Sequence, residues 1–234
     1  MLAIYKRELK ALFTSFIAYI FLFIIFLLSG IFFYMTSLSM LSTSLAATFG
    51  VLFFVNVIIL PSLSMRAFSE DKQQRSDTLL FASPVKLGSI VMGKFLAAYT
   101  VFALGLSITI IYAIIMSAYS PVDWSVFFCT IIGMLLTGAA FLSLGIFVSV
   151  FTENQFVAFI MALGLSAAWL LIDILKDIFK SGVIPKIVSF LSMYAHYNNF
   201  NIGIYSLTST IFFISFTLIF LFLTGRVLDK RRWG

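Results

Sequence analysis

Long uncharged apolar runs divide the chain into six segments, each long enough to cross a membrane. A helix rises about 1.5 Å per residue, so about 20 residues span the roughly 30 Å hydrocarbon core of a bilayer. The runs are continuously apolar rather than alternating, which favours helices over the strands of a membrane β-barrel. We therefore predict an all-α polytopic membrane protein with six transmembrane helices, at about residues 16–35, 46–65, 95–120, 124–152, 154–172 and 206–225.

The amino-acid composition agrees with this interpretation and excludes most other classes. Of the 234 residues, 62% are hydrophobic and 10% are charged, and the mean hydropathy is +1.13. A soluble domain is roughly half apolar and about a quarter charged, so this chain carries more apolar side chain than a globular core can bury. A single cysteine excludes an intramolecular disulfide and a cysteine zinc site. We expect one membrane domain over residues 1–234.

The few charged residues fall unequally on the two sides that six spans define. Twelve of the 15 lysines and arginines share a side with both termini, together with six acidic residues. The other three lysines lie between the fifth and sixth spans, and the remaining three acidic residues lie on that same opposite side. Short loops rich in positive charge stay in the cytoplasm, so both termini are predicted to be cytoplasmic.

The first 13 residues form an amphipathic pattern of their own. Tyr5 shares a helical face with two leucines, and the opposite face carries Lys6, Arg7 and Lys10. This pattern predicts an interfacial helix on the cytoplasmic leaflet, in contact with membrane lipid. The alternative is a disordered basic tail that only sets the topology. No small-x-small cleavage site follows the first apolar run, so we expect that run to be an uncleaved span.

The longest cytoplasmic loop, residues 66–94, concentrates charge between the second and third spans. Four basic and three acidic residues lie in residues 66–86, around an apolar stretch at residues 79–81. Ser76 or Asp77 can cap a short helix over residues 78–81, which Pro84 would end. Such a helix suits a groove on a partner protein better than lipid. The alternative is a solvated loop that only joins two helices.

Several motifs of the loop and of the chain ends match one known family. The most specific stretch is residues 75–85, Arg-Ser-Asp-Thr-Leu-Leu-Phe-Ala-Ser-Pro-Val, with Arg66, Glu70 and Asp71 before it and Gly93-Lys94 after it. The basic amphipathic start, the turn at residues 152–155 and the closing Asp-Lys-Arg-Arg-Trp of residues 229–233 match less specifically. In these motifs the chain resembles the type-2 ATP-binding-cassette (ABC-2) permeases, in particular their gliding-motility-like branch. With the six spans, the resemblance covers essentially the whole chain.

The resemblance implies partners as well as a fold. In that family the loop between the second and third spans carries a coupling helix, which sits in a cleft of the ATP-hydrolysing subunit. The corresponding docking surface here comprises Arg66, Glu70, Asp71, Arg75, Asp77, Thr78, Leu79, Leu80 and Phe81, with Glu153 nearby. The family also implies a second permease chain, identical or different, two ATPase subunits and a bacterial cell membrane. An accessory membrane protein is compatible with this assembly, and no nucleic-acid partner is expected.

The chain shows no nucleotide site of its own. A complete G-x-x-x-x-G-K-[ST] loop does not occur, because Gly93-Lys94 is followed by Phe95, which lacks the hydroxyl that a phosphate loop needs at that position. ATP and Mg²⁺ would therefore be bound by the partner ATPase subunit, and we expect no catalytic residue, cofactor or metal in this chain. The predicted function is the membrane permease subunit of an ATP-driven exporter. The alternative is an ATP-independent secondary transporter or channel.

Polar residues inside or near the spans each admit two interpretations. Asn56 and Pro61 are candidate pathway residues, since Pro61 frees the carbonyl of residue 57 and Asn56 can hydrogen-bond across a helix interface. A packing role is the alternative for both. Glu153, between the fourth and fifth spans, is interpreted as a cytoplasmic helix cap in preference to a proton or cation site.

Residues 173–205 are predicted to hold two helices at the outer leaflet, like the re-entrant helices of the family. These helices would act as an exit gate or as a structural cap.

His196 is the only histidine and has no other metal-ligating residue nearby in the sequence, so we expect it to be a hydrogen-bonded interface residue. Small residues four positions apart predict tight helix contacts; the pairs begin at Gly93, Gly145 and Gly164.

Overall fold

The computed structural model confirms an all-helical membrane protein. It describes residues 1–39, 44–73, 87–119, 121–178 and 190–233, with only the backbone of residues 173–178 and 231–233. This described part contains helices and no strands. Six of the helical segments are long and apolar enough to cross a membrane: Phe16–Leu38, Ala46–Gln73, Leu87–Tyr119, Trp124–Ser149, Gln155–Ile172 and Leu207–Lys230.

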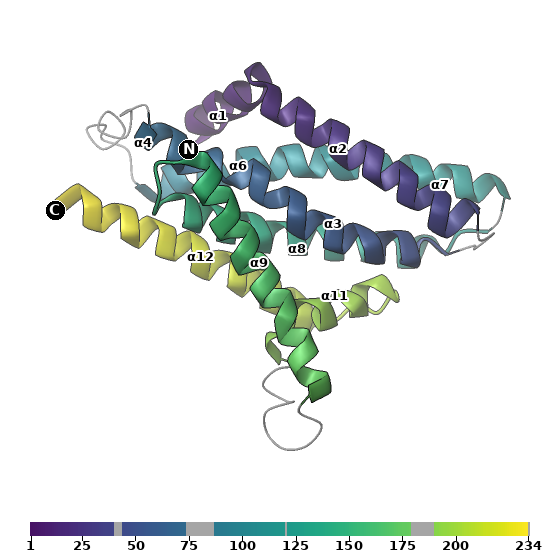
Figure 1. Cartoon of the computed structure of the whole chain (residues 1–234). Helices are drawn as coiled ribbons and strands as arrows, with labels where there is room; N and C mark the ends of the chain where they lie inside the picture. Colours follow the sequence, from purple (N-terminus) through teal and green to yellow (C-terminus); the bar gives the residue numbers. More distant parts are fainter. Residues whose placement is uncertain (40–43, 74–86, 120, 179–189, 234) are drawn as a thin grey trace.

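The helices form a bundle with both chain ends at one side (Figure 1). In chain order they are α1 (Leu2–Thr14), α2 (Phe16–Phe33), the π-helical η1 (Tyr34–Leu38), α3 (Ala46–Ser64), α4 (Arg66–Gln73), α6 (Leu87–Leu106), α7 (Ile108–Tyr119), α8 (Trp124–Ser149), α9 (Gln155–Ile178), α11 (Met193–Asn201) and α12 (Leu207–Trp233). In the view of Figure 1, α9 and α12 run obliquely to α3 and α8.

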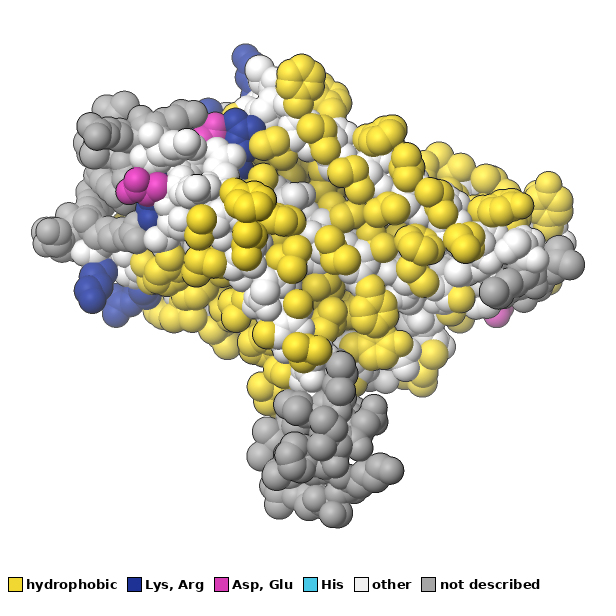
Figure 2. Space-filling model, in the orientation of Figure 1, with side chains coloured by type: hydrophobic (Ala, Val, Ile, Leu, Met, Phe, Trp, Pro, Cys, Tyr) yellow, Lys and Arg dark blue, Asp and Glu magenta, His cyan; other side chains and the backbone are white. Residues whose placement is uncertain are grey.

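Charge is concentrated at the end of the bundle that carries α1, α4 and both termini, which we call the charged end. Figure 2 shows lysine, arginine and acidic side chains gathered there, while apolar side chains cover most of the rest of the face in view. This separation is expected for a chain whose long helices cross lipid, because charged groups avoid the hydrocarbon.

The structure corrects the predicted start of the third span and the extent of the loop before it. The prediction started the span at residue 95, after Lys94, whereas α6 begins at Leu87 and contains Lys94. Residues Arg66–Gln73, predicted to belong to the loop, form α4, which continues the second span. The prediction took uncharged runs as spans and therefore excluded Lys94. The carboxylate partners of Lys94 lie within the protein, so its ammonium group does not need water. The short helix predicted at residues 78–81 lies outside the described residues.

The outer region differs from the predicted pair of separate helices. α9 continues to Ile178, so the charged stretch from residue 173 extends the fifth span, as expected where neither glycine nor proline interrupts it. Residues 179–189 lie outside the described part. α11 is anchored to the bundle: the Tyr197 hydroxyl donates to the Phe49 carbonyl at 3.0 Å, and Thr130 Oγ1 lies 3.1 Å from the Phe200 carbonyl oxygen.

α8 is the span around which the others pack. It contacts α3, α6, α9, α11 and α12, and it is the most buried of the six spans. Its glycines allow close approach: a Cβ built at Gly138 would lie 1.9 Å from the Phe102 ring, and one at Gly145 would lie 1.9 Å from Ser64 Oγ. The predicted tight contact at Gly145 is thus confirmed. Gly164 on α9, by contrast, has no atom of the described residues within 4 Å of its Cβ position.

We expect Gly138→Ala to lower the thermal unfolding midpoint of the purified protein in detergent. Phe102 is fully buried and cannot move without displacing its neighbours, and overpacking of this kind costs about 1–3 kcal/mol. Gly164→Ala is the matched control, and it should leave the midpoint unchanged or raise it, since glycine costs about 0.5–1 kcal/mol in a helix interior. Equal midpoints for the two variants would contradict the close approach of α6 to α8.

Candidate functional site

Four segments meet at the charged end: α1, α4, the first turns of α6 and the turn between α8 and α9. α1 reaches this position because Ser15 adopts an extended conformation (φ −89°, ψ 154°) and ends the helix before α2 begins. α4 reaches it because the second span continues beyond Ser64. Several of the residues that join these segments are polar or charged, which makes this cluster the candidate functional site.

α1 is docked on α6 through a close backbone approach. A Cβ at Gly93 would lie 2.9 Å from Ile4 Cγ2, so only glycine leaves room for α1 at this point. The Tyr5 hydroxyl lies 3.1 Å from Thr100 Oγ1, and Tyr5 is the donor because Thr100 already donates to the Leu96 carbonyl. The expected amphipathic helix is therefore present, and part of its apolar face is covered by protein.

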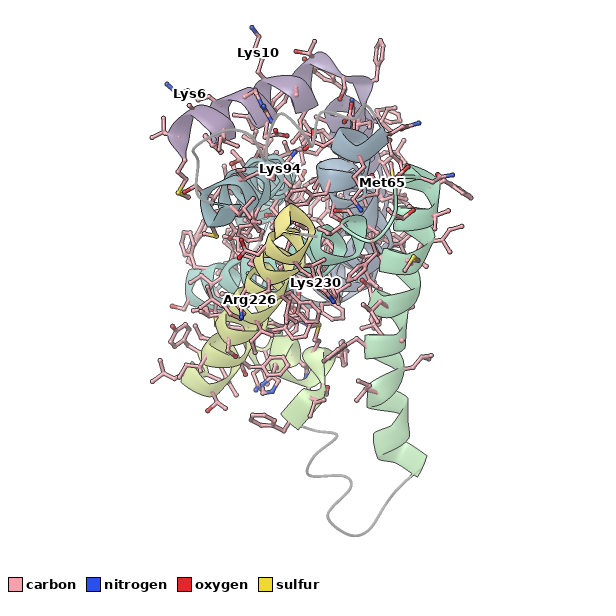
Figure 3. The ribbon with its side chains drawn as sticks, turned by 90° about the vertical axis from the view of Figure 1, so that its left-hand side faces the viewer. Lys6, Lys10, Met65, Lys94, Arg226 and Lys230 are labelled. Carbon is pink, nitrogen blue, oxygen red and sulfur yellow. The ribbon has the colours of Figure 1, made fainter. Side chains whose placement is uncertain are left out.

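The basic face of α1 is turned outward. Lys6 and Lys10 are exposed and point away from the bundle, whereas Lys94 lies inside it (Figure 3). This orientation agrees with the predicted contact between the basic side chains and lipid head groups.

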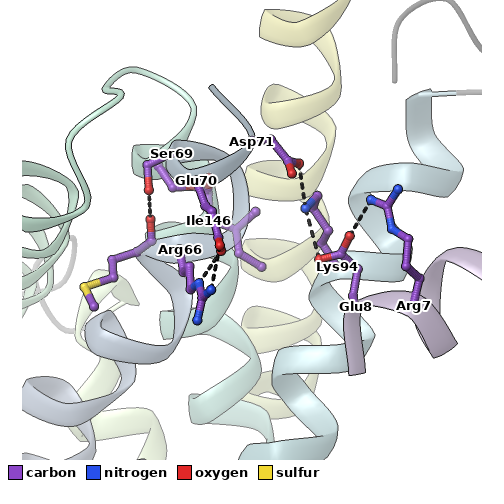
Figure 4. A network of polar contacts seen from close by, with 10 residues as sticks. Arg7, Glu8, Arg66, Ser69, Glu70, Asp71, Lys94 and Ile146 are labelled. Atoms are coloured by element: carbon purple, nitrogen blue, oxygen red, sulfur yellow. Dashed lines mark hydrogen bonds and ion pairs between the residues drawn. The ribbon is translucent and has the colours of Figure 1, made fainter. Parts of the chain in front are cut away.

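Lys94 is a buried cation shared by two carboxylates from different segments. Its ammonium nitrogen lies 3.1 Å from Glu8 Oε2 of α1 and 2.8 Å from Asp71 Oδ2 of α4 (Figure 4), and its side chain is only 3% exposed. The Phe68 ring centroid lies 5.2 Å from the same nitrogen, close enough for a cation–π contact. A buried ammonium is tolerated only when its charge is compensated and hydrogen-bonded. The two carboxylates compensate the charge, and Glu8 also accepts a hydrogen bond from Lys94.

Glu8 is held in its ionised form by two cations. Arg7 Nη2 lies 2.7 Å from Glu8 Oε1, on the carboxylate oxygen opposite the one that faces Lys94. Burial alone would raise the pKa of Glu8, but the attraction of Lys94 and the hydrogen bonds from Arg7 and Lys94 outweigh it, so this pKa lies below its ordinary value of 4.5.

α4 is also tied to the turn between α8 and α9. The Lys72 ammonium donates to the Val150 carbonyl, and Gln155 Nε2 lies 3.5 Å from Gln73 Oε1. Within α4, Arg66 and Glu70 form an ion pair one helical turn apart. The short helix is thus connected to α6 and α1 on one side and to the α8–α9 turn on the other.

Asn154 caps α9, which corrects the interpretation of Glu153 as the cap. Its Oδ1 accepts a hydrogen bond from the Phe156 amide at 2.9 Å, and Thr152 Oγ1 accepts one from the Asn154 amide at 3.2 Å. Glu153 itself is exposed and does not supply the capping oxygen. It lies in the turn that α4 contacts.

The predicted docking residues fall into two groups. Arg66, Glu70 and Asp71 lie together on α4, near the turn that carries Glu153. The others lie outside the described residues: Arg75, Asp77, Thr78, Leu79, Leu80 and Phe81.

Sequence reasoning did not select Glu8, Lys72 and Lys94 for the site. The sequence does set two of them apart. Lys94 is the only charged residue in residues 87–119, and Glu8 is the only acidic residue in α1.

The candidate pathway residues lie inside the bundle. Asn56 is 3% exposed, its amide nitrogen lies 3.5 Å from Met134 Sδ on α8, and its Oδ1 has no hydrogen-bond partner within the described part of the chain. Pro61, one and a half turns further along α3, is also buried. These surroundings are those of packing residues, and their role in a pathway stays a prediction.

His196 is hydrogen-bonded at both ring nitrogens, as predicted for an interface histidine. Nδ1 lies 3.0 Å from Ser209 Oγ and Nε2 lies 3.0 Å from the Phe190 carbonyl oxygen. No group of three or more histidine, cysteine or acidic residues that could hold a metal ion occurs among the residues that the structure describes.

No protein family model and no curated protein matches this chain in sequence. The relation to ABC-2 permeases therefore stays a resemblance in its motifs.

We expect Glu8 to make the protein less stable in acid. Because its pKa is lower in the folded protein, its contribution to stability is complete above about pH 4.5 and is lost as the pH falls through the folded value. Glu8→Gln should therefore lower the unfolding midpoint at pH 7, and the difference from the native protein should shrink as the pH drops below about 4.5. A difference that is constant between pH 7 and pH 3.5 would contradict the ion pairs of Glu8.

Proposed function

We propose that this chain is the membrane permease subunit of an ATP-driven exporter of the ABC-2 type. It dimerises with a second permease chain to form the translocation path, and it is driven through its charged end by a separate ATPase subunit that binds ATP and Mg²⁺. The charged end faces the cytoplasm of a bacterial cell, in agreement with its excess of basic residues.

The observation that carries this proposal is the attachment of α4. This short charged helix leads directly into the loop with the permease-like motif, and it is connected to three other parts of the bundle. Asp71 reaches Lys94 of α6, Lys72 reaches the Val150 carbonyl after α8, and Gln73 meets Gln155 at the start of α9. A force applied to the loop would therefore act on several spans at once.

This arrangement suits a mechanical role better than a chemical one. When two ATPase subunits close on ATP, they pull on the loops that dock into them. Here the pull would pass from α4 to α6 and to the α8–α9 turn, and rigid spans would tilt together. Alternating access between the two leaflets follows from that tilt in a dimer of such chains.

The proposal is tested by purifying the tagged chain from its native membranes in mild detergent. We expect an ATP-binding polypeptide and vanadate-sensitive ATP hydrolysis to co-purify with the native chain. Leu80→Asp places a carboxylate in an apolar cleft, so it should lower the recovery of that polypeptide about tenfold. A tenfold loss corresponds to only about 1.4 kcal/mol of binding free energy.

The matched control is Leu191→Asp, the same substitution in the outer region away from the charged end. It should leave recovery of the ATPase unchanged, since the Leu191 side chain is partly exposed there and the hydrogen bond from Trp169 goes to the Leu191 backbone carbonyl. The proposal fails if no ATPase accompanies the native chain, or if both variants retain it equally.

One observation favours the second candidate, an ATP-independent transporter or channel. Asn56 places a buried amide oxygen near the middle of a span, next to the carbonyl of residue 57 that Pro61 frees, and such groups form ion sites in secondary transporters. Ion flux into liposomes that contain this chain alone, abolished by Asn56→Leu, would favour that candidate. We expect no such flux.

A further inference from the structure

The packing of the charged end separates α1 from α4. α1 packs mainly on α6 and α2, with Ile4 against Gly93 and Tyr5 against Thr100. α4 packs instead on α8, α9 and the end of α3. The Lys94 ammonium contacts carboxylates from both, Glu8 of α1 and Asp71 of α4.

We propose that Lys94 is a positioning residue that makes α1 and α4 move together. Its single buried charge is divided between the two segments, so neither carboxylate can move away without leaving the ammonium undercompensated in a site that is only 3% exposed. Displacement of α4 by a partner is then passed to α1, the helix whose outward lysines face the lipid head groups.

The geometry distinguishes this bridge from an ordinary ion pair. Arg66 and Glu70 pair one turn apart within α4, and Arg7 and Glu8 are neighbours within α1. Lys94 comes from a third helix and lies over the Phe68 ring, which fixes the ammonium from a further side. Glycine at position 93 brings α1 close enough for Glu8 to reach it.

The role of the bridge in transport rests on the proposed function, but the bridge itself can be measured in the isolated chain. Two pairs of nitroxide labels are placed by cysteine substitution in a Cys129→Ala background, and the protein is reconstituted in lipid nanodiscs. The first pair, Lys10 and Phe156, joins α1 to α9, across the bridge. The second pair, Lys10 and Ile114, joins α1 to the span formed by α6 and α7. All three label positions are exposed.

Asp71→Asn is the primary variant, because it removes the charge that α4 contributes and leaves the pair between Glu8 and Lys94 in place. We expect it to broaden the distance distribution of the first label pair and to leave that of the second unchanged. The triple variant Glu8→Gln, Asp71→Asn, Lys94→Met should also broaden the first distribution, and it contains no buried unpaired charge from this cluster that would prevent folding.

The matched control is Arg66→Met with Glu70→Gln, which removes an ion pair inside α4 and should change neither distribution. Unchanged distributions in both bridge variants would overturn the proposal. Broadening of both label pairs would overturn it as well, because Lys94 would then hold α1 on α6 without linking it to α4. Failure of the proposed function has a different signature: no ATPase binds the chain, yet the distances respond to Asp71→Asn.

Discussion

A buried ammonium group must keep negative partners, and this requirement organises the charged end of the protein. Lys94 lies about two turns inside a span that begins at Leu87, at 3% exposure, and its charge is compensated by Glu8 and Asp71. Those two residues come from the first helix and from the short helix that leads into the loop. The fold at this end therefore depends on an electrostatic condition, whereas the rest of the bundle is held by the packing of apolar and small side chains.

The helices in the remainder of the bundle are packed so closely that a displacement of one helix would displace its neighbours. α8 is in close contact with α6 at Gly138 and with α3 at Gly145, where a methyl group would not fit. At the opposite end, the hydroxyl of Tyr197 fixes α11 to α3, and the Tyr197 ring stacks on Phe53 with centroids 4.7 Å apart. Close-packed interfaces of this kind shift between discrete arrangements instead of deforming continuously. A displacement at α4 would thus reach the outer region.

The spans were predictable because apolar runs of about 20 residues have no stable environment other than lipid or a protein interior. The tight contacts at Gly93 and Gly145 followed from residue spacing, although the same spacing at Gly164 marks no contact with the residues that the structure describes. Lys94 was assigned to the loop because a rule based on charge treats every lysine as water-facing. Its partners Glu8 and Asp71 are distant in sequence, and only the folded chain shows that the three side chains meet.

The central claim, that a separate ATPase acts on the charged end, is tested most directly by site-specific photo-crosslinking. A benzoylphenylalanine at Gln73, the exposed last residue of α4, is activated in native membranes, with one at the exposed Ile204 of the opposite end as the control. Our account predicts a crosslink from position 73, and none from position 204, to a polypeptide that binds ATP. A crosslink from position 73 only to lipid or to other copies of this chain would contradict it.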